Sequence, residues 1–197
     1  DVSALRKAVE RLAAVGDLGR NVPYADALSA LDPDHGREQR VHAVGARHDL
    51  RQLGRHRDHA RPGLGAGKRK DVVDQLGLEA LAKAANGGPI KRPSDGKEVK
   101  SVVFIQCAGQ RSDKEGELPY CSGHCCNTSV KQAMYFKDAN PDVDTVVLYS
   151  DLRVPGMGED FYRSAQKKGV IFTKAKVAQV AAEGDGCKVR FRDLILD

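Results

Sequence analysis

The pattern of apolar and polar positions becomes regular only from Asp71 onward. Three apolar runs, SVVFIQC, TVVLYSDL and VIFTKAKVAQV, have the length of strands and few charged residues. The segments before and between these runs have helical spacing of apolar residues and end at Asn, Pro or Gly signals. The pattern predicts strands at 101–107, 145–152 and 170–180, and helices over 71–87, over 128–139 and before Gly169.

Strands that alternate with helices predict an α/β fold, a Rossmann-like parallel sheet with right-handed crossovers. The continuous apolar run of the second strand is typical of a sheet covered on both faces. After the third strand, the turn EGDG and the alternating segment CKVRFRDL predict a β-hairpin at the C-terminus. Its alternation places Cys187, Val189 and Phe191 on one face, so Cys187 is interpreted as a small core residue.

Residues 1–70 lack the regular pattern of apolar positions that begins at Asp71. We predict that this N-terminal part is irregular or helical. Residues 3–15 have the spacing of a short amphipathic helix, but no period continues over 20–70, where five of the six histidines lie. The pair His56 and His59 lacks further ligands at metal-binding spacing. We therefore divide the chain into a poorly ordered segment, 1–70, and an α/β domain, 71–197. Arginine gives way to lysine near this division, so a reading-frame error upstream is a further hypothesis, which resequencing of the coding DNA would test.

The charge of the chain gives little support to nucleic-acid binding. The net charge is +5 and the pI is about 9.0, but residues 1–70 hold 14 Lys+Arg against 9 Asp+Glu. The remaining 18 basic and 18 acidic residues balance, so the domain at 71–197 is neutral. A basic arm at 51–61 is the alternative, but it lacks interleaved aromatic residues. No apolar run reaches 18 residues and no apolar signal region opens the chain, so we expect neither a membrane span nor a signal peptide.

Four of the five cysteines lie between Ser101 and Asn127 and are the candidate metal ligands: Cys107, Cys121, Cys125 and Cys126. The first ends a predicted strand and the other three precede a predicted helix, whose N-terminal N–H groups favour thiolate and an anionic centre. Four thiolates match the ligand number of an iron–sulfur cluster, although the spacing is not that of ferredoxins. A structural zinc site that includes His124 stays open, but adjacent cysteines reach one ion only with strain. A disulfide is less favoured because nothing else indicates an oxidising compartment.

The segments FIQCAGQR, PYCSGHCCNTSVKQA and YSDLRVPGMGEDFYRSAQKKGVIFTKAKV resemble the A subunit of heterodisulfide reductase over residues 71–197. The resemblance is nearest to the A subunit of the quinone-interacting membrane-bound oxidoreductase. It implies that the four cysteines bind a [4Fe-4S] cluster, in an FAD protein of thioredoxin-reductase-like fold. It also implies an iron–sulfur flavoprotein oxidoreductase that passes electrons between FAD and partner subunits, in the cytoplasm, with any membrane association made through those subunits.

The glycine pattern limits what this chain can do alone. A dinucleotide fingerprint would place G-x-G-x-x-G after the first strand, where this chain has CAGQR. We therefore expect no direct NAD(P)H binding here, and we expect a fragment whose FAD is held by the full-length parent protein. The fragment alone is expected to be inactive, and no FAD-contacting residue is assigned. The alternative function is a zinc-stabilised binding module without a redox role.

Overall fold

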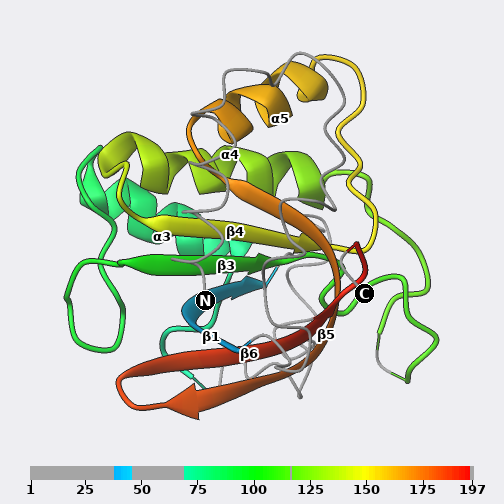
Figure 1. Ribbon diagram of the computed structural model, residues 1–197, viewed down its shortest axis with the longest axis horizontal. Helices are drawn as coiled ribbons and strands as arrows, with labels where there is room; N and C mark the ends of the chain where they lie inside the picture. The colour runs from blue at the N-terminus through cyan, green and yellow to red at the C-terminus, as the bar shows by residue number, and fades with distance from the viewer. Residues whose placement is uncertain (1–37, 46–68, 116, 196–197) are drawn as a thin grey trace.

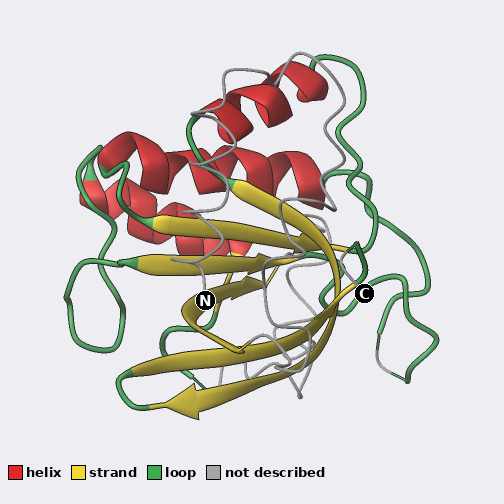
Figure 2. Ribbon diagram, viewed as in Figure 1, coloured by secondary structure: helices red, strands yellow, loops and turns green. Residues whose placement is uncertain are grey.

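The structure is a computed structural model, and it describes residues 38–45, 69–115 and 117–195. Within these ranges a six-stranded sheet has the order β2-β1-β3-β4-β5-β6. Helices α3, α4 and α5 lie on one side of it, and the β5–β6 hairpin extends from the other (Figures 1 and 2). The elements are β1 (Glu38–Gly45), β2 (Val73–Asp74), α3 (Gln75–Ala85), β3 (Ser101–Ile105), α4 (Cys125–Ala139), β4 (Asp144–Tyr149), α5 (Gly158–Lys167), β5 (Ile171–Glu183) and β6 (Gly186–Asp193).

The predicted α/β fold is confirmed. Strands β3, β4 and β5 are parallel neighbours, with Val103 opposite Val146 and Val146 opposite Ile171. The predicted C-terminal hairpin is formed by β5 and β6, which pair antiparallel around a turn at Gly184. Because parallel strands end at the same edge, the segments that follow β3 and β4 are brought together there.

The prediction of an irregular or helical N-terminal part is wrong for Glu38–Gly45. These residues form β1, whose second half pairs in parallel with β3 and whose first half pairs antiparallel with β6. The strand therefore joins the two ends of the series β3-β4-β5-β6 into a closed ring. The predicted helix at 3–15, the His56–His59 pair and the basic arm at 51–61 lie outside the described residues.

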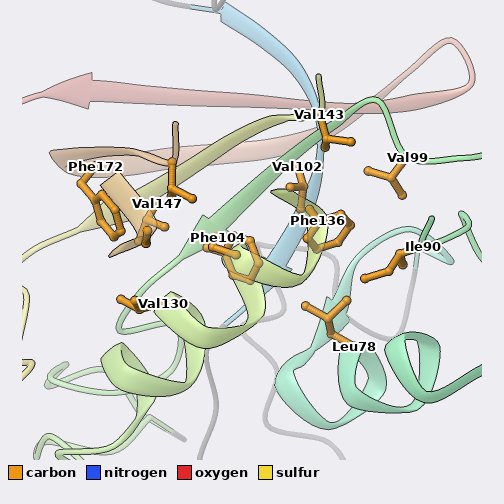
Figure 3. Close-up of a cluster of buried hydrophobic side chains, with 13 residues drawn as sticks. Leu78, Ile90, Val99, Val102, Phe104, Val130, Phe136, Val143, Val147 and Phe172 are labelled. Atoms are coloured by element: carbon orange, nitrogen blue, oxygen red, sulfur yellow. The ribbon is translucent and has the colours of Figure 1, made fainter. Parts of the chain in front are cut away.

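The larger of the two main clusters of buried residues lies on the face of the sheet that the helices cover, and it contains aromatic side chains (Figure 3). Phe104 of β3 is fully buried and meets Phe136 of α4 edge to face, with ring centroids 6.2 Å apart. Val130 and Ala133 lie inward on α4. Helix α4 is thus anchored to the sheet along its length, which orients its N-terminal turn at the carboxyl edge.

The opposite face of the sheet packs against the hairpin. Val103, Ile105 and Leu148 contribute to this second core, together with Cys187 and Val189 of β6. Cys187 is 3% exposed and alternates with outward-facing Arg190 and Arg192, so its interpretation as a core residue is confirmed. It belongs to a different cluster of buried residues from Cys125 and Cys126.

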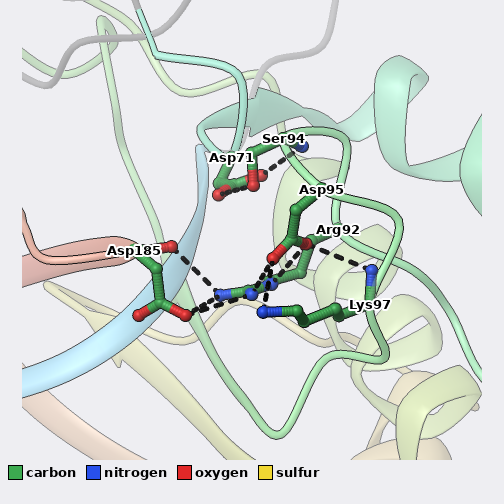
Figure 4. A network of polar contacts seen from close by, with 6 residues as sticks. All are labelled: Asp71, Arg92, Ser94, Asp95, Lys97 and Asp185. Carbon is green, nitrogen blue, oxygen red and sulfur yellow. Dashed lines mark hydrogen bonds and ion pairs between the residues drawn. The ribbon is translucent and has the colours of Figure 1, made fainter.

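A polar network fixes the connection between α3 and β3 to the hairpin turn (Figure 4). Arg92, whose side chain is 9% exposed, donates to the Asp95 carboxylate and, at 3.0 Å, to the backbone oxygen of Asp185. Ser94 donates from its hydroxyl to Asp71 at 2.6 Å. These contacts close the loop against the turn before β6, at the edge opposite the cysteines, so the loop does not contribute to the candidate site.

Two helix starts differ from the prediction. Helix α3 begins at Gln75 because Asp74 caps it, accepting from the Gly77 N–H at 2.7 Å. Helix α4 begins at Cys125 and not at Thr128, since the Thr128 N–H already donates to the His124 carbonyl. Among the described residues, no helix has the length and apolarity needed to cross a membrane.

Candidate metal centre

The four candidate cysteines all lie at the carboxyl edge of the sheet. Cys107 comes two residues after β3 ends, Cys121 lies in the following loop, and Cys125 and Cys126 form the first turn of α4. Cys125 and Cys126 are 1% and 3% exposed, while Cys107 and Cys121 are partly exposed. Two of the candidate ligands are therefore anchored in the protein interior, and two are partly exposed at the edge.

Three of these thiols lie close enough to influence one another's pKa values. Burial raises the pKa of Cys107, and the charges of Cys125 and Cys121 raise it further. A hydrogen bond with Cys125 lowers the pKa of Cys126 to about 7, against burial and the charges of Cys107 and Cys121. The same bond and burial raise the pKa of Cys125. The pKa of each of these three thiols thus depends on others of the set.

The four thiols lie at the same edge of the sheet, but they are not arranged around a single point. Within the described ranges, no three His, Cys, Asp or Glu side chains are already grouped closely enough to hold a single metal ion. His124, the additional candidate for a zinc site, is exposed at the residue that precedes α4, and its carbonyl accepts from Thr128. A role for His124 as a ligand stays untested.

The backbone at Cys107 turns sharply out of the strand. Its φ is +54°, in the left-handed region that non-glycine residues seldom adopt, at a cost of about 1–3 kcal/mol. A turn follows, in which the Gln110 N–H donates to the Cys107 carbonyl at 3.2 Å. The surrounding structure therefore holds this candidate ligand in an unusual backbone conformation at the carboxyl edge of the sheet.

The loop after Cys107 folds back on itself, which explains how Cys121 returns. The Leu118 N–H donates to the Gly109 carbonyl at 3.0 Å, and the Arg111 N–H to the Tyr120 carbonyl at 3.3 Å. The Ser122 N–H then donates to the side-chain oxygen of Gln110, which is buried. These bonds join the two ends of the loop and bring Cys121 toward Cys107.

Backbone N–H groups already point at sulfur. The Gly123 N–H donates to Cys121 Sγ at 3.4 Å, and the Arg153 N–H bonds to Cys126 and lowers its pKa. Cys125 and Cys126 supply the first N–H groups of α4, which have no acceptor within the helix. Such donors stabilise negative charge on sulfur, and hydrogen bonds to the sulfurs are one determinant of cluster potential.

A glutamine on α3 secures the first turn of α4. Gln75 Nε2 donates to the Cys125 carbonyl and to Ser129 Oγ, both at 2.9 Å, and Gln75 is 2% exposed. Gln132 of α4 donates back to the Gln75 carbonyl at 2.8 Å. Sequence reasoning missed this contact, since Gln75 lies 50 residues from Cys125 and has no local signal.

Replacing Gln75 with alanine is expected to lower the free energy of unfolding by about 1–3 kcal/mol, because the Cys125 carbonyl and Ser129 hydroxyl lose a buried donor. Chemical denaturation measures the change. Gln166→Ala is the control: that exposed glutamine bonds the Tyr162 hydroxyl on α5, and a change within about 0.5 kcal/mol is expected. Equal losses in the two variants would contradict a positioning role for Gln75.

Comparison with known proteins identifies relatives that share this region. No profile of a known protein family matches the chain. It is 40% identical over 135 residues to the A subunit of the ferredoxin/F420H2-dependent CoB–CoM heterodisulfide reductase of Methanosarcina acetivorans, covering 66% of this chain and 17% of the relative. It is 37% identical over 137 residues to the A subunit of the H2:CoB–CoM heterodisulfide,ferredoxin reductase of Methanothermobacter marburgensis, covering 67% and 21%. The iron-sulfur A subunit of the CoB–CoM heterodisulfide reductase of Methanocaldococcus jannaschii is 38% identical over 138 residues, with the same coverage. The chain thus spans about a fifth of the length of these relatives.

Proposed function

From the kinship of this chain with the A subunit of heterodisulfide reductase, we propose that Cys107, Cys121, Cys125 and Cys126 hold a [4Fe-4S] cluster in an electron-transfer oxidoreductase. The family resemblance predicted from the sequence is confirmed by these relatives. The nearer likeness to the A subunit of the quinone-interacting membrane-bound oxidoreductase stays a prediction.

The gathering of four thiols at one sheet edge is the observation that supports this proposal. Their donor set is all sulfur, as most iron–sulfur clusters require, and N–H donors surround it. Gln106, directly before Cys107, is 6% exposed, and neither of its side-chain amide atoms has a partner among the described residues. Buried polar atoms normally have partners, so this edge fits a polar or charged group that the protein side chains do not supply.

When bound, the cluster supplies one-electron transfer, and the residues of the chain control where it lies and how readily it is reduced. The Leu152 and Val154 side chains pack against Cys125 and Cys126 and exclude water from that side. Gly158 keeps this packing close, because a Cβ there would lie 2.6 Å from Asn127 Oδ1. Cys107 and Cys121, which are partly exposed, lie on the side open to an electron partner.

The wider assignments are also proposals, and they follow from the family resemblance noted in the sequence. FAD would be held by the full-length parent protein, and the partners would be other subunits of a redox complex, without nucleic acid. The location would be cytoplasmic, with any membrane contact made through partner subunits. The division into 1–70 and 71–197, and inactivity of the fragment alone, stay predictions.

Anaerobic purification tests the proposal. The protein is expected to be brown, to contain roughly four irons and four acid-labile sulfides at this site, and to give an EPR signal on reduction. Colourless protein with one zinc per chain and no sulfide would overturn the proposal. That result would support the alternative, a zinc-stabilised binding module without a redox role.

A further inference from the structure

Arg111 places its guanidinium directly against the candidate centre. Arg111 donates from one guanidinium nitrogen toward Cys107 Sγ, at 3.9 Å. Its side chain is 29% exposed, so the cation is only partly solvated. A guanidinium at this distance places a positive charge beside the sulfur, where it favours negative charge on that atom.

A carboxylate on a second segment of the chain holds the guanidinium in position. Its other terminal nitrogen donates to Asp151, just after β4, at 2.6 Å. Asp151 also lies 3.7 Å from Lys174 on β5, and its backbone oxygen lies 3.8 Å from Cys126 Sγ. The bonds to Asp151 and Cys107 raise the pKa of Arg111, so it is a cation at every working pH. Arg111 therefore links Cys107 to the segment that follows β4, and the backbone of that segment lies beside Cys126.

The backbone at Arg111 is held in the same unusual region as that of Cys107. Its φ is +55°, and its N–H is bonded to the Tyr120 carbonyl next to Cys121. The side chain lies at the sheet edge and outside the clusters of buried residues, so packing of the described cores does not require this conformation. The conformation directs the guanidinium to the space between Cys107 and Asp151.

We propose that Arg111 is a positioning residue that makes reduction of the centre easier by holding a fixed cation beside Cys107. This inference rests on the proposed cluster function. Reduction adds one electron and no atom to the centre, so the cluster with its ligands becomes one unit more negative. A neighbouring cation stabilises the reduced form more than the oxidised form, and partial burial limits the screening of that effect.

Redox titration of the complete protein, with dithionite as the one-electron donor and viologen mediators, tests this inference. Arg111→Gln is expected to disfavour reduction by about tenfold, which corresponds to a midpoint about 59 mV more negative for one electron. Arg111→Lys keeps the charge but loses the two-pronged geometry, so a smaller shift in the same direction is expected. Arg163→Gln removes the same charge from an exposed pair with Glu159 on α5 and is expected to leave the midpoint unchanged.

Iron and sulfide content separates the possible failures. Absence of both from the unmodified protein would overturn the cluster function itself. Full iron with an unchanged midpoint in Arg111→Gln, or an equal shift in Arg163→Gln, would overturn the role of Arg111 alone. If Arg111→Gln retains little iron, Arg111→Lys decides, because a midpoint shifted there by tenfold or more at full iron content, despite the retained charge, would overturn the inference.

Discussion

Serine in place of any one of Cys107, Cys121, Cys125 and Cys126 is expected to remove most of the iron and sulfide from the protein. Each of these residues would hold a different iron, and three backbone segments supply them: the end of β3, the loop and the first turn of α4. Cysteine thiolates hold such clusters, and a serine hydroxyl, which is far less acidic than a thiol, is a much weaker ligand for iron. Colorimetric iron and sulfide assays on anaerobically purified variants measure the loss.

Cys187→Ser is the matched control, because it makes the same chemical change at a cysteine that lies in the opposite core. It is expected to keep its iron and sulfide and to lose about 1–3 kcal/mol of stability, since the hydroxyl enters an apolar site. Full iron in Cys107→Ser would mean that the fourth ligand is another residue. Loss of iron from a folded Cys187→Ser protein would place Cys187 at the centre and contradict the core assignment.

Phe104→Ala is expected to lower the free energy of unfolding by about 3–5 kcal/mol. Phe104 is fully buried and packs edge to face on Phe136, so truncation leaves a cavity between β3 and α4 that both rigid elements prevent from closing. The same contact supports the two elements that carry Cys107 and Cys125. Urea denaturation followed by circular dichroism measures the loss.

Phe161→Ala makes the same truncation on α5, where the residue is 49% exposed. A change within about 0.5 kcal/mol is expected there, since little apolar surface is returned to water. Comparable losses of unfolding free energy in the two variants would contradict the predicted contribution of the core between β3 and α4 to stability.

The sequence by itself was sufficient to predict those elements whose pattern lies within one continuous stretch of the chain. The apolar runs around Phe104, Val147 and Phe172 were sufficient to predict parallel strands, because a strand buried on both faces excludes polar residues over its length. Strict alternation in β6 predicted its buried face, with Cys187 included. The spacing of the four cysteines indicated a shared centre in the same way, since a strand end and a helix start are recognisable locally.

The tertiary structure alone decided the pairings between distant segments. Glu38–Gly45 has no strong strand pattern of its own and becomes a strand through backbone bonds to β3 and β6, which lie more than 50 residues further along the chain. Gln75, on another helix, bonds the Cys125 carbonyl in the first turn of α4. Arg111 meets Asp151 across 40 residues. Hydrogen bonds and ion pairs of this kind leave no period in the sequence, because their partners are chosen by the folded backbone and not by neighbouring residues.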